Sequence, residues 1–185
     1  MISYAPFLKK AQLSEDIHKA YLFASRAHEG QERHGGKPYI EHPLAVAALV
    51  SEHYVSAHED MVMAALLHDV VEDTPYTLED IWDKFGERVA RLVRDLTDPE
   101  QEEGETRNQY FKRVRARWPG FSQEAKVIKC ADRLHNLRSL PESHWDARTK
   151  AGYAKRSLEM IEAFYFREPV KLADLVKIEA MKWEG

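Results

Sequence analysis

The sequence predicts an all-α fold, and three observations support this prediction. Apolar residues recur every three or four positions in successive segments, which is the spacing of an amphipathic helix. Most of these segments begin or end at residues that commonly cap or stop a helix. No stretch of useful length alternates apolar and polar residues as a half-buried strand would, and the sequence has no internal repeat or low-complexity segment.

The first predicted helix begins after Ser14, because serine is a preferred N-terminal cap, and Gly30 closes it. Its apolar face consists of Ile17, Ala20, Tyr21, Ala24 and Ala27 or His28. Residues 31–42 contain two glycines and a proline and are predicted to form a loop. Pro43 suits the first turn of a second helix, which is largely buried.

The most apolar run predicts a central helix over residues 59–73, which Pro75 stops. Thr77 and Asp80 then have the spacing of a capping box, with aspartate in place of the usual glutamate. They start a short helix that ends before Gly86. A further helical face follows and consists of Val89, Leu92, Val93 and Leu96.

The second half of the chain is predicted to be helical as well. Residues 98–105 are acidic, contain proline and glycine, and are expected to form a mobile loop. Residues 107–118 form a basic amphipathic helix, whose charges we interpret as a solvated face rather than an anion-binding site. A helix capped by Ser122 runs to about Leu140, and two more helices follow, separated near residues 167–169.

Length and composition limit the class of protein. The chain has 185 residues, a length typical of one domain, and its 44% hydrophobic and 31% charged residues are typical of globular proteins. Its net charge of -4 disfavours general nucleic-acid binding, which requires a basic surface. It has one cysteine, Cys130, no cleavable signal pattern and no membrane-length apolar run. We expect a single domain over residues 1–185, in the cytoplasm, with no membrane association and with its oligomeric state left open.

Residues 64–74 concentrate ionisable groups at the end of the predicted central helix. Burying such groups is costly unless each has a partner, and a metal ion is a common one. The helical repeat places Glu72 one turn after His68 and Asp73 one turn after Asp69. The pattern indicates a metal–water site with carboxylates nearby for proton transfer. The alternative is a helix end followed by a solvated acidic tail.

Two further motifs favour the metal site. They are RHGGKPYIEHP at residues 33–43 and IKCADRLHNLR at residues 128–138. Together with HDVVED at residues 68–73, they resemble the hydrolase domain of the RelA/SpoT family, a branch of the HD-domain phosphohydrolases. The resemblance covers about residues 20–140 and extends more weakly to Tyr153. It implies a compact multi-helix HD-domain bundle around a metal site. Since no synthetase or regulatory domain follows, the chain resembles a stand-alone small alarmone hydrolase.

The candidate metal ligands come from all three motifs. His42 is expected just before one helix, His68 and Asp69 at the end of a second, and Asp132 on a third. Two imidazoles and two carboxylates suit manganese, iron, cobalt or zinc, and the lack of cysteine ligands argues against a structural zinc site. The family resemblance implies that these four residues are the ligands and favours a single Mn2+.

The resemblance also implies roles for residues around the metal. Glu72 and Asp73 match a Glu-Asp pair that orients the attacking water or passes protons. His34 stands where relatives commonly have lysine, and Ser139 replaces a common threonine while keeping the hydroxyl group. The implied substrate-binding residues are Arg33, His34, Asn136, Ser139 and Tyr153.

The residues alone predict metal-dependent hydrolysis of a nucleotide-like phosphate. The resemblance implies a narrower reaction, hydrolysis of guanosine 3′-diphosphate 5′-diphosphate or its 5′-triphosphate form to GDP or GTP plus pyrophosphate. The alternatives are a phosphohydrolase for another nucleotide or phosphorylated cofactor, and a nucleotide-sensing module with little turnover. The expected partner is a small-molecule nucleotide. Nucleic-acid binding through residues 107–117 is disfavoured by the overall charge and the adjacent acidic loop.

Overall fold

The computed structural model describes residues 14–33, 35–166 and 170–183. Within these ranges, extended structure is limited to an isolated bridge between Glu32 and Pro38, which confirms the predicted all-α class. The predicted separation of the last two helices near residues 167–169 lies outside the described residues. The helices are α2 (Glu15–Ala27), α3 (Glu41–His53), α4 (Glu59–Leu67), α5 (Val70–Asp73), α6 (Leu78–Leu96), α7 (Arg107–Arg117), α8 (Gln123–Ser139), α9 (Ala147–Ala163) and α10 (Lys171–Met181), with the short 3-10 helices η1 (Trp118–Gly120) and η2 (Leu140–Glu142).

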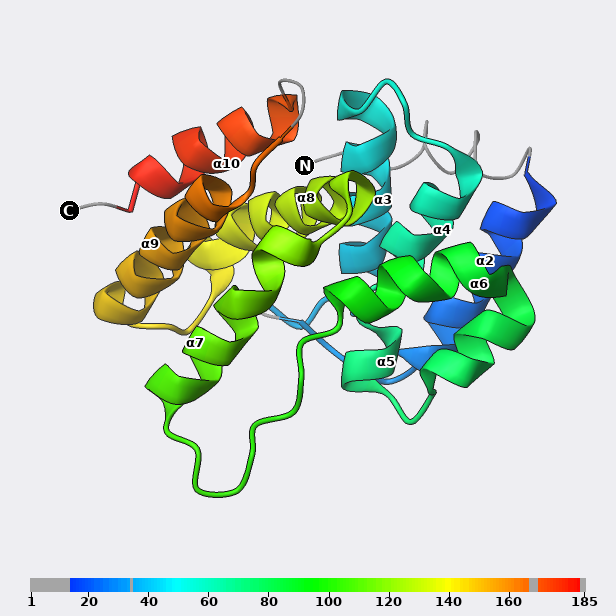
Figure 1. Ribbon diagram of the computed structural model, residues 1–185, viewed down its shortest axis with the longest axis horizontal. Helices are drawn as coiled ribbons and strands as arrows, with labels where there is room; N and C mark the ends of the chain where they lie inside the picture. Colours follow the sequence, from blue (N-terminus) through cyan, green and yellow to red (C-terminus); the bar gives the residue numbers. More distant parts are fainter. Residues whose placement is uncertain (1–13, 34, 167–169, 184–185) are drawn as a thin grey trace.

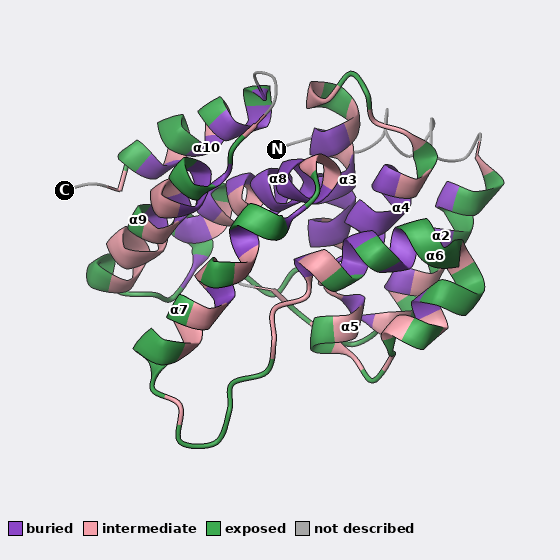
Figure 2. Ribbon diagram, viewed as in Figure 1, coloured by how far each residue is buried: buried purple, intermediate pink, exposed green. Residues whose placement is uncertain are grey.

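Two helices, α4 and α8, form the centre of the core. Helix α4 packs against α2, α3 and α6, whereas α8 packs against α3, α6, α9 and α10. Figure 1 shows α8 crossing the middle of the molecule, with α9 and α10 to one side and α2 and α6 to the other. All residues of α4 from Met61 to Leu67 are buried, and Figure 2 shows buried residues gathered along α3, α4 and α8. Among the described helices, none combines the length and hydropathy of a membrane span.

The predicted N-terminal helix caps are confirmed, whereas the first helix ends at Ala27 with His28 as its C-terminal cap, before the predicted Gly30. The hydroxyl group of Ser14 accepts a hydrogen bond from the backbone N–H of Ile17, and Ser122 caps α8 in the same way. Thr77 and Asp80 form the reciprocal capping box of α6. Gly86 has φ of 83° inside α6 and interrupts the helical geometry, so the two predicted helices are the two halves of one kinked element. Glycine suits this position because a left-handed φ strains other residues.

The central helix predicted over residues 59–73 is wrong in one respect. Helix α4 ends at Leu67, Asp69 has φ of -96° and ψ of -5°, and α5 starts at Val70. In a continuous helix, neighbouring side chains diverge by about 100°. The break instead lets His68 and Asp69 converge, with Nε2 and Oδ1 3.1 Å apart. His42 also differs from expectation, since it is the second residue of α3 and does not precede that helix.

These elements meet where the site is predicted. The start of α3, the junction between α4 and α5, and the middle of α8 carry the candidate metal ligands, and α3, α4 and α8 contact one another. The predicted loop over residues 98–105 contains no helix and is fastened to α7. The guanidinium group of Arg113 donates to the Glu105 carboxylate at 2.8 Å and to the Glu100 carbonyl oxygen at 2.7 Å. The loop therefore has a defined path beside the site.

Candidate active site

The four predicted metal-ligand side chains meet at one point, which we call the metal cluster: His42, His68, Asp69 and Asp132. The His42 Nε2 atom lies 3.3 Å from Asp69 Oδ2 and 3.2 Å from Asp132 Oδ1. The His68 Nε2 atom lies 3.1 Å from Asp69 Oδ1 and 3.9 Å from Asp132 Oδ1. Donor atoms of His42, His68 and Asp69 all lie within 4.8 Å of one another, and Asp132 joins them through its contacts with the two histidines. These are ligand types with which proteins hold a divalent cation.

Both histidines direct Nε2 toward this point. The His68 Nδ1 atom lies 2.9 Å from the Ala65 carbonyl oxygen and donates a proton to it, which leaves the Nε2 lone pair free. The His42 Nδ1 atom lies 2.8 Å from Nδ1 of His135. The two Nε2 atoms are 3.2 Å apart, and two facing lone pairs at this distance require a proton or a cation between them. The geometry therefore fits a bound metal ion.

The electrostatics of the metal cluster also favour positive charge. Burial acts to raise the pKa of Asp69, but His68 and His42 hold that pKa well below its usual value. Burial likewise opposes ionisation of Asp132, and His42 and Lys129 keep its pKa low. Burial acts to lower the pKa of His68, yet Asp69 raises it to about 9. The carboxylates thus outweigh desolvation and attract either a proton or a metal cation.

Glu72 lies beside the metal cluster and lines a cavity next to it. Its Oε2 atom accepts a hydrogen bond of 3.0 Å from the backbone N–H of Asp98. Although the residue is solvent-accessible through the cavity, surrounding protein desolvates its carboxyl group and raises its pKa to about 7, an effect that Lys129 opposes. Glu72 can therefore exchange a proton near neutral pH.

Asp73 is attached to the metal cluster through a tyrosine that the sequence interpretation did not select. The Tyr39 hydroxyl group lies 2.8 Å from Asp69 Oδ2 and 2.7 Å from Asp73 Oδ2. The side-chain amide of Gln31 also donates to the Asp73 carbonyl oxygen at 2.9 Å, which fastens the end of α5 to the preceding loop. Asp73 is thus positioned by contacts from outside its own helix.

The metal cluster opens into a cavity of about 910 Å³. Four of the five predicted substrate-binding residues line it: Arg33, Asn136, Ser139 and Tyr153. The fifth, His34, lies outside the described residues. Arg33 Nη2 donates to Asn136 Oδ1 at 2.5 Å, and Asn136 Nδ2 donates to Asp132 Oδ1 at 2.6 Å. A hydrogen-bonded chain therefore links the cavity wall to the metal cluster.

Several residues of the site were not selected from the sequence. Tyr39 and His135 both lie inside the quoted motifs, and this position is the signal by which they could have been found. The charges of the basic helix α7 were predicted to form a solvated face, and the exposed Lys112 agrees with this. However, Arg107 and Phe111 on the same helix line the cavity. Further lining residues come from the segment before α9 and from α9 itself, namely His144, Trp145 and Arg156.

Comparisons with known proteins agree with the motifs. The HD domain family matches residues 20–160. The chain is 41% identical over 142 residues to guanosine-3′,5′-bis(diphosphate) 3′-pyrophosphohydrolase of Haemophilus influenzae, covering 75% of this chain and 20% of the relative. It is 39% identical over 150 residues to bifunctional (p)ppGpp synthase/hydrolase SpoT of Escherichia coli, covering 78% of this chain and 20% of SpoT. The chain thus spans about a fifth of the length of these curated relatives.

A solved structure matches over nearly the whole chain. It is that of a metazoan ortholog of SpoT described as hydrolysing ppGpp and playing a role in starvation responses. The TM-score is 0.80 with 29% sequence identity, and the match covers 93% of this chain and 97% of the other. The shared length shows that the similarity extends beyond the three motifs to the arrangement of the helices. The chain belongs to the HD domain family, and within that family it is related to SpoT.

Proposed function

We propose that this protein hydrolyses guanosine 3′-diphosphate 5′-diphosphate and its 5′-triphosphate form at the 3′ position, releasing pyrophosphate and leaving GDP or GTP. One observation carries the proposal: the metal cluster, Glu72 and Asp73 lie together at the wall of a nucleotide-sized cavity of about 910 Å³. The relatives named for this reaction supply the choice of substrate. A small-molecule nucleotide is therefore the proposed partner.

His42, His68, Asp69 and Asp132 are the proposed ligands of a single Mn2+ ion, and the donor set also suits iron, cobalt or zinc. The facing Nε2 atoms and the low pKa of Asp69 support this assignment. When bound, such an ion supplies the charge that polarises a phosphoryl oxygen and lowers the pKa of a water molecule.

The roles proposed for the other residues follow from their contacts. Glu72, with a pKa of about 7, is the proposed acceptor of the proton from the attacking water. Asp73, held by Tyr39, orients that water. Arg33 and Asn136 form one hydrogen-bonded unit in the cavity wall and are proposed to hold the nucleoside, together with Ser139 and Tyr153.

Two structural features support the remaining parts of the proposal. One hydrophobic cluster includes residues from Ile17 to Ala180, as expected if residues 1–185 form a single domain. Cys130 is buried and unpaired, which agrees with a cytoplasmic location. A module that only senses nucleotides would not need two carboxylates beside the metal cluster. The positions of Glu72 and Asp73 therefore favour an enzyme.

A nucleotide panel tests the proposal. The Mn2+-loaded full chain is incubated with both 3′-pyrophosphorylated guanosine nucleotides, GTP, GDP and ATP, and the products are separated and identified. We expect pyrophosphate and GDP or GTP from the first two and little product from the others. Treatment with a chelator should stop the reaction, and added Mn2+ should restore it. Tight nucleotide binding without any product would instead identify a sensing module, and equally rapid release of phosphate from GTP would identify a general phosphohydrolase.

A further inference from the structure

Three guanidinium groups in the cavity wall form no ion pair with a described residue. Arg107 is the first residue of α7, Arg133 lies in α8, and Arg156 lies in α9. Throughout the described part of the chain, no carboxylate oxygen lies within ion-pair distance of any of the three, and the Nε atom of Arg133 is buried without a hydrogen-bond partner. Lys129 in the same cavity differs, because it lies 3.9 Å from both Asp98 and Asp132.

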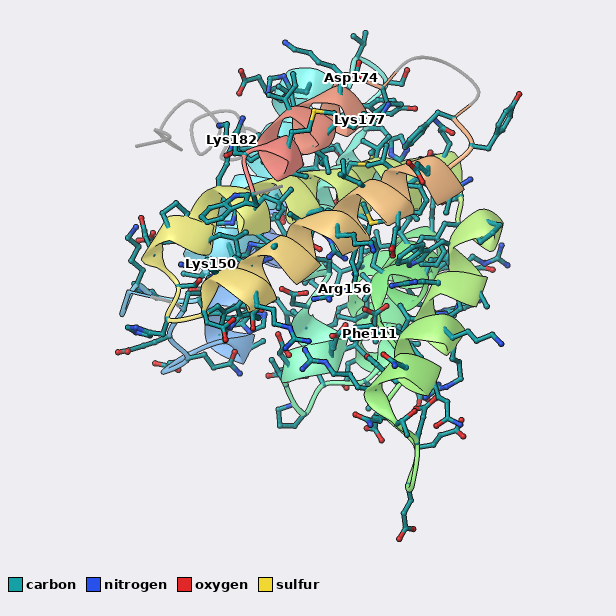
Figure 3. All side chains as sticks on the ribbon, turned by 90° about the vertical axis from the view of Figure 1, so that its left-hand side faces the viewer. Phe111, Lys150, Arg156, Asp174, Lys177 and Lys182 are labelled. Carbon is teal, nitrogen blue, oxygen red and sulfur yellow. The ribbon has the colours of Figure 1, made fainter. Side chains whose placement is uncertain are left out.

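Aromatic rings hold these arginines in place. The guanidinium carbons of Arg107 and Arg156 lie 5.5 Å and 5.0 Å from the centroid of the Phe111 ring, and that of Arg133 lies 4.6 Å from the centroid of the Tyr153 ring. In Figure 3, Arg156 and Phe111 meet between α9 and α7. A cation–π contact orients a guanidinium group without neutralising its charge and leaves its N–H donors available to a ligand.

The positive charges of Arg133 and Arg107 disfavour that of Arg156, whereas burial opposes the charge of Arg133 and nearby Tyr153, Asp132 and Asp98 raise its pKa. Burial lowers the pKa of Arg156, and Arg133 and Arg107 lower it further. Placing like charges together in a partly desolvated cavity costs free energy unless an anion completes the site. Planar guanidinium groups bind phosphate strongly through paired, charge-assisted hydrogen bonds. The cluster is therefore better suited to a bound phosphate group than to the ligand-free protein.

We propose that Arg107, Arg133 and Arg156 form a second anion subsite, which binds the 5′ phosphate groups of a nucleotide while its 3′ phosphates face the metal cluster. This inference rests on the proposed function. The substrate carries anionic groups on both sides of its ribose, and Figure 1 shows α7 and α9 to one side of the molecule with α4 and α5 to the other. Each end of the substrate thus has its own set of counter-charges.

Binding of GDP tests the subsite without using turnover. Arg107→Gln and Arg156→Gln should each raise the Kd of GDP about tenfold, the effect of losing one charge-assisted hydrogen bond. Arg156→Lys, which keeps the charge but loses the planar fork, should have a smaller effect. Lys112→Gln and Lys155→Gln are matched controls, because both lysines are exposed on the same two helices and neither lines the cavity. Circular dichroism checks that every variant is folded.

Turnover tests which end of the nucleotide uses the subsite. For guanosine 3′-diphosphate 5′-diphosphate, both arginine variants should raise KM about tenfold. For guanosine 3′-diphosphate, which has no 5′ phosphates, their KM should equal that of the unmodified protein. Equal changes for the two substrates, or unchanged GDP affinity in both arginine variants, would overturn the proposal. If the unmodified protein releases pyrophosphate from neither substrate, the proposed function fails, and the GDP affinities alone then decide whether the subsite exists.

Discussion

The Tyr39 hydroxyl group lies within hydrogen-bonding distance of Asp69 and Asp73 at once, at 2.8 Å and 2.7 Å. Burial and the two neighbouring carboxylates raise the pKa of Tyr39, so the phenol stays protonated at every physiological pH. Because the phenol has a single proton, it donates to one carboxylate at a time. It therefore couples the position of a proposed metal ligand to that of a proposed catalytic carboxylate.

Tyr39→Phe should lower kcat or the affinity for Mn2+ by about ten- to a hundredfold, the usual effect of removing a hydrogen bond to a metal ligand. The fold should persist, because phenylalanine keeps the ring that stacks on His28 with centroids 4.6 Å apart. Metal titration and steady-state kinetics give the two values. Tyr76→Phe, at a tyrosine packed against Phe23 and away from the cavity, serves as the control. Wild-type values for both quantities would show that the hydroxyl group has no positioning role.

Replacing either His68 or Asp132 with alanine should remove both activity and most of the bound metal. Each contributes a donor atom within 4 Å of other cluster members. Elemental analysis of the purified variants measures metal content directly. His18, an exposed residue of α2, provides the control as His18→Ala. Full metal occupancy in both site variants would exclude the proposed ligand set.

Glu72→Gln and Asp73→Asn should keep the metal and lose turnover. Neither carboxylate belongs to the metal cluster, and an amide cannot accept a proton from water. Loss of a proton-transfer group typically costs about a hundred- to ten-thousand-fold in rate. Single-turnover kinetics and metal content should be measured on the same preparations, with the exposed Asp83→Asn as the control. Near-normal turnover in both amide variants would remove the pair from the mechanism.

The pH dependence of turnover should report on Glu72. A carboxyl group with a pKa raised to about 7 is protonated below that pH, so a base at this position is lost as the pH falls through 7. Consequently kcat should fall about tenfold per unit on the acidic side. Lys129→Gln should move this limb to higher pH, because the ammonium group favours the carboxylate. A pH profile that stays flat from pH 5 to about 8 would contradict the assignment.

Local signals in the sequence account for most of the helix boundaries. Ser14, Thr77 and Ser122 each cap a helix as predicted, because a cap is formed by residues adjacent in the chain. The break after Leu67 was not predicted, since it depends on the convergence of His68 and Asp69 with residues of α3 and α8. Helix propensity and periodicity contain no information about that tertiary requirement.

The cavity likewise combines residues that local motifs predict with residues that only the folded chain brings together. His42, His68, Asp69 and Asp132 occur in compact motifs, and the structure brings these four together. Arg107 and Arg156 are far apart in sequence, on helices whose charged residues resemble any solvated face. They share the Phe111 ring only because α7 and α9 approach each other in the folded chain. Their common site could therefore not be read from spacing.

The position of bond cleavage gives the sharpest test of how the nucleotide lies in the cavity. With the 3′ phosphates at the metal cluster, water should attack the phosphorus attached to the ribose 3′ oxygen. The bond between that oxygen and phosphorus breaks, a new bond joins phosphorus to the water oxygen, and the 3′ oxygen takes up a proton. Arg33, Asn136 and Tyr153 would hold the nucleoside in this orientation, since reaction requires the attacking and leaving atoms to be aligned. Hydrolysis in ¹⁸O-labelled water should place the label in pyrophosphate and leave the nucleoside and its 5′ phosphates unlabelled. Label in inorganic phosphate would instead mean attack at a terminal phosphorus, and labelled pyrophosphate released together with guanosine 3′-diphosphate would mean that the nucleotide binds in the reverse orientation.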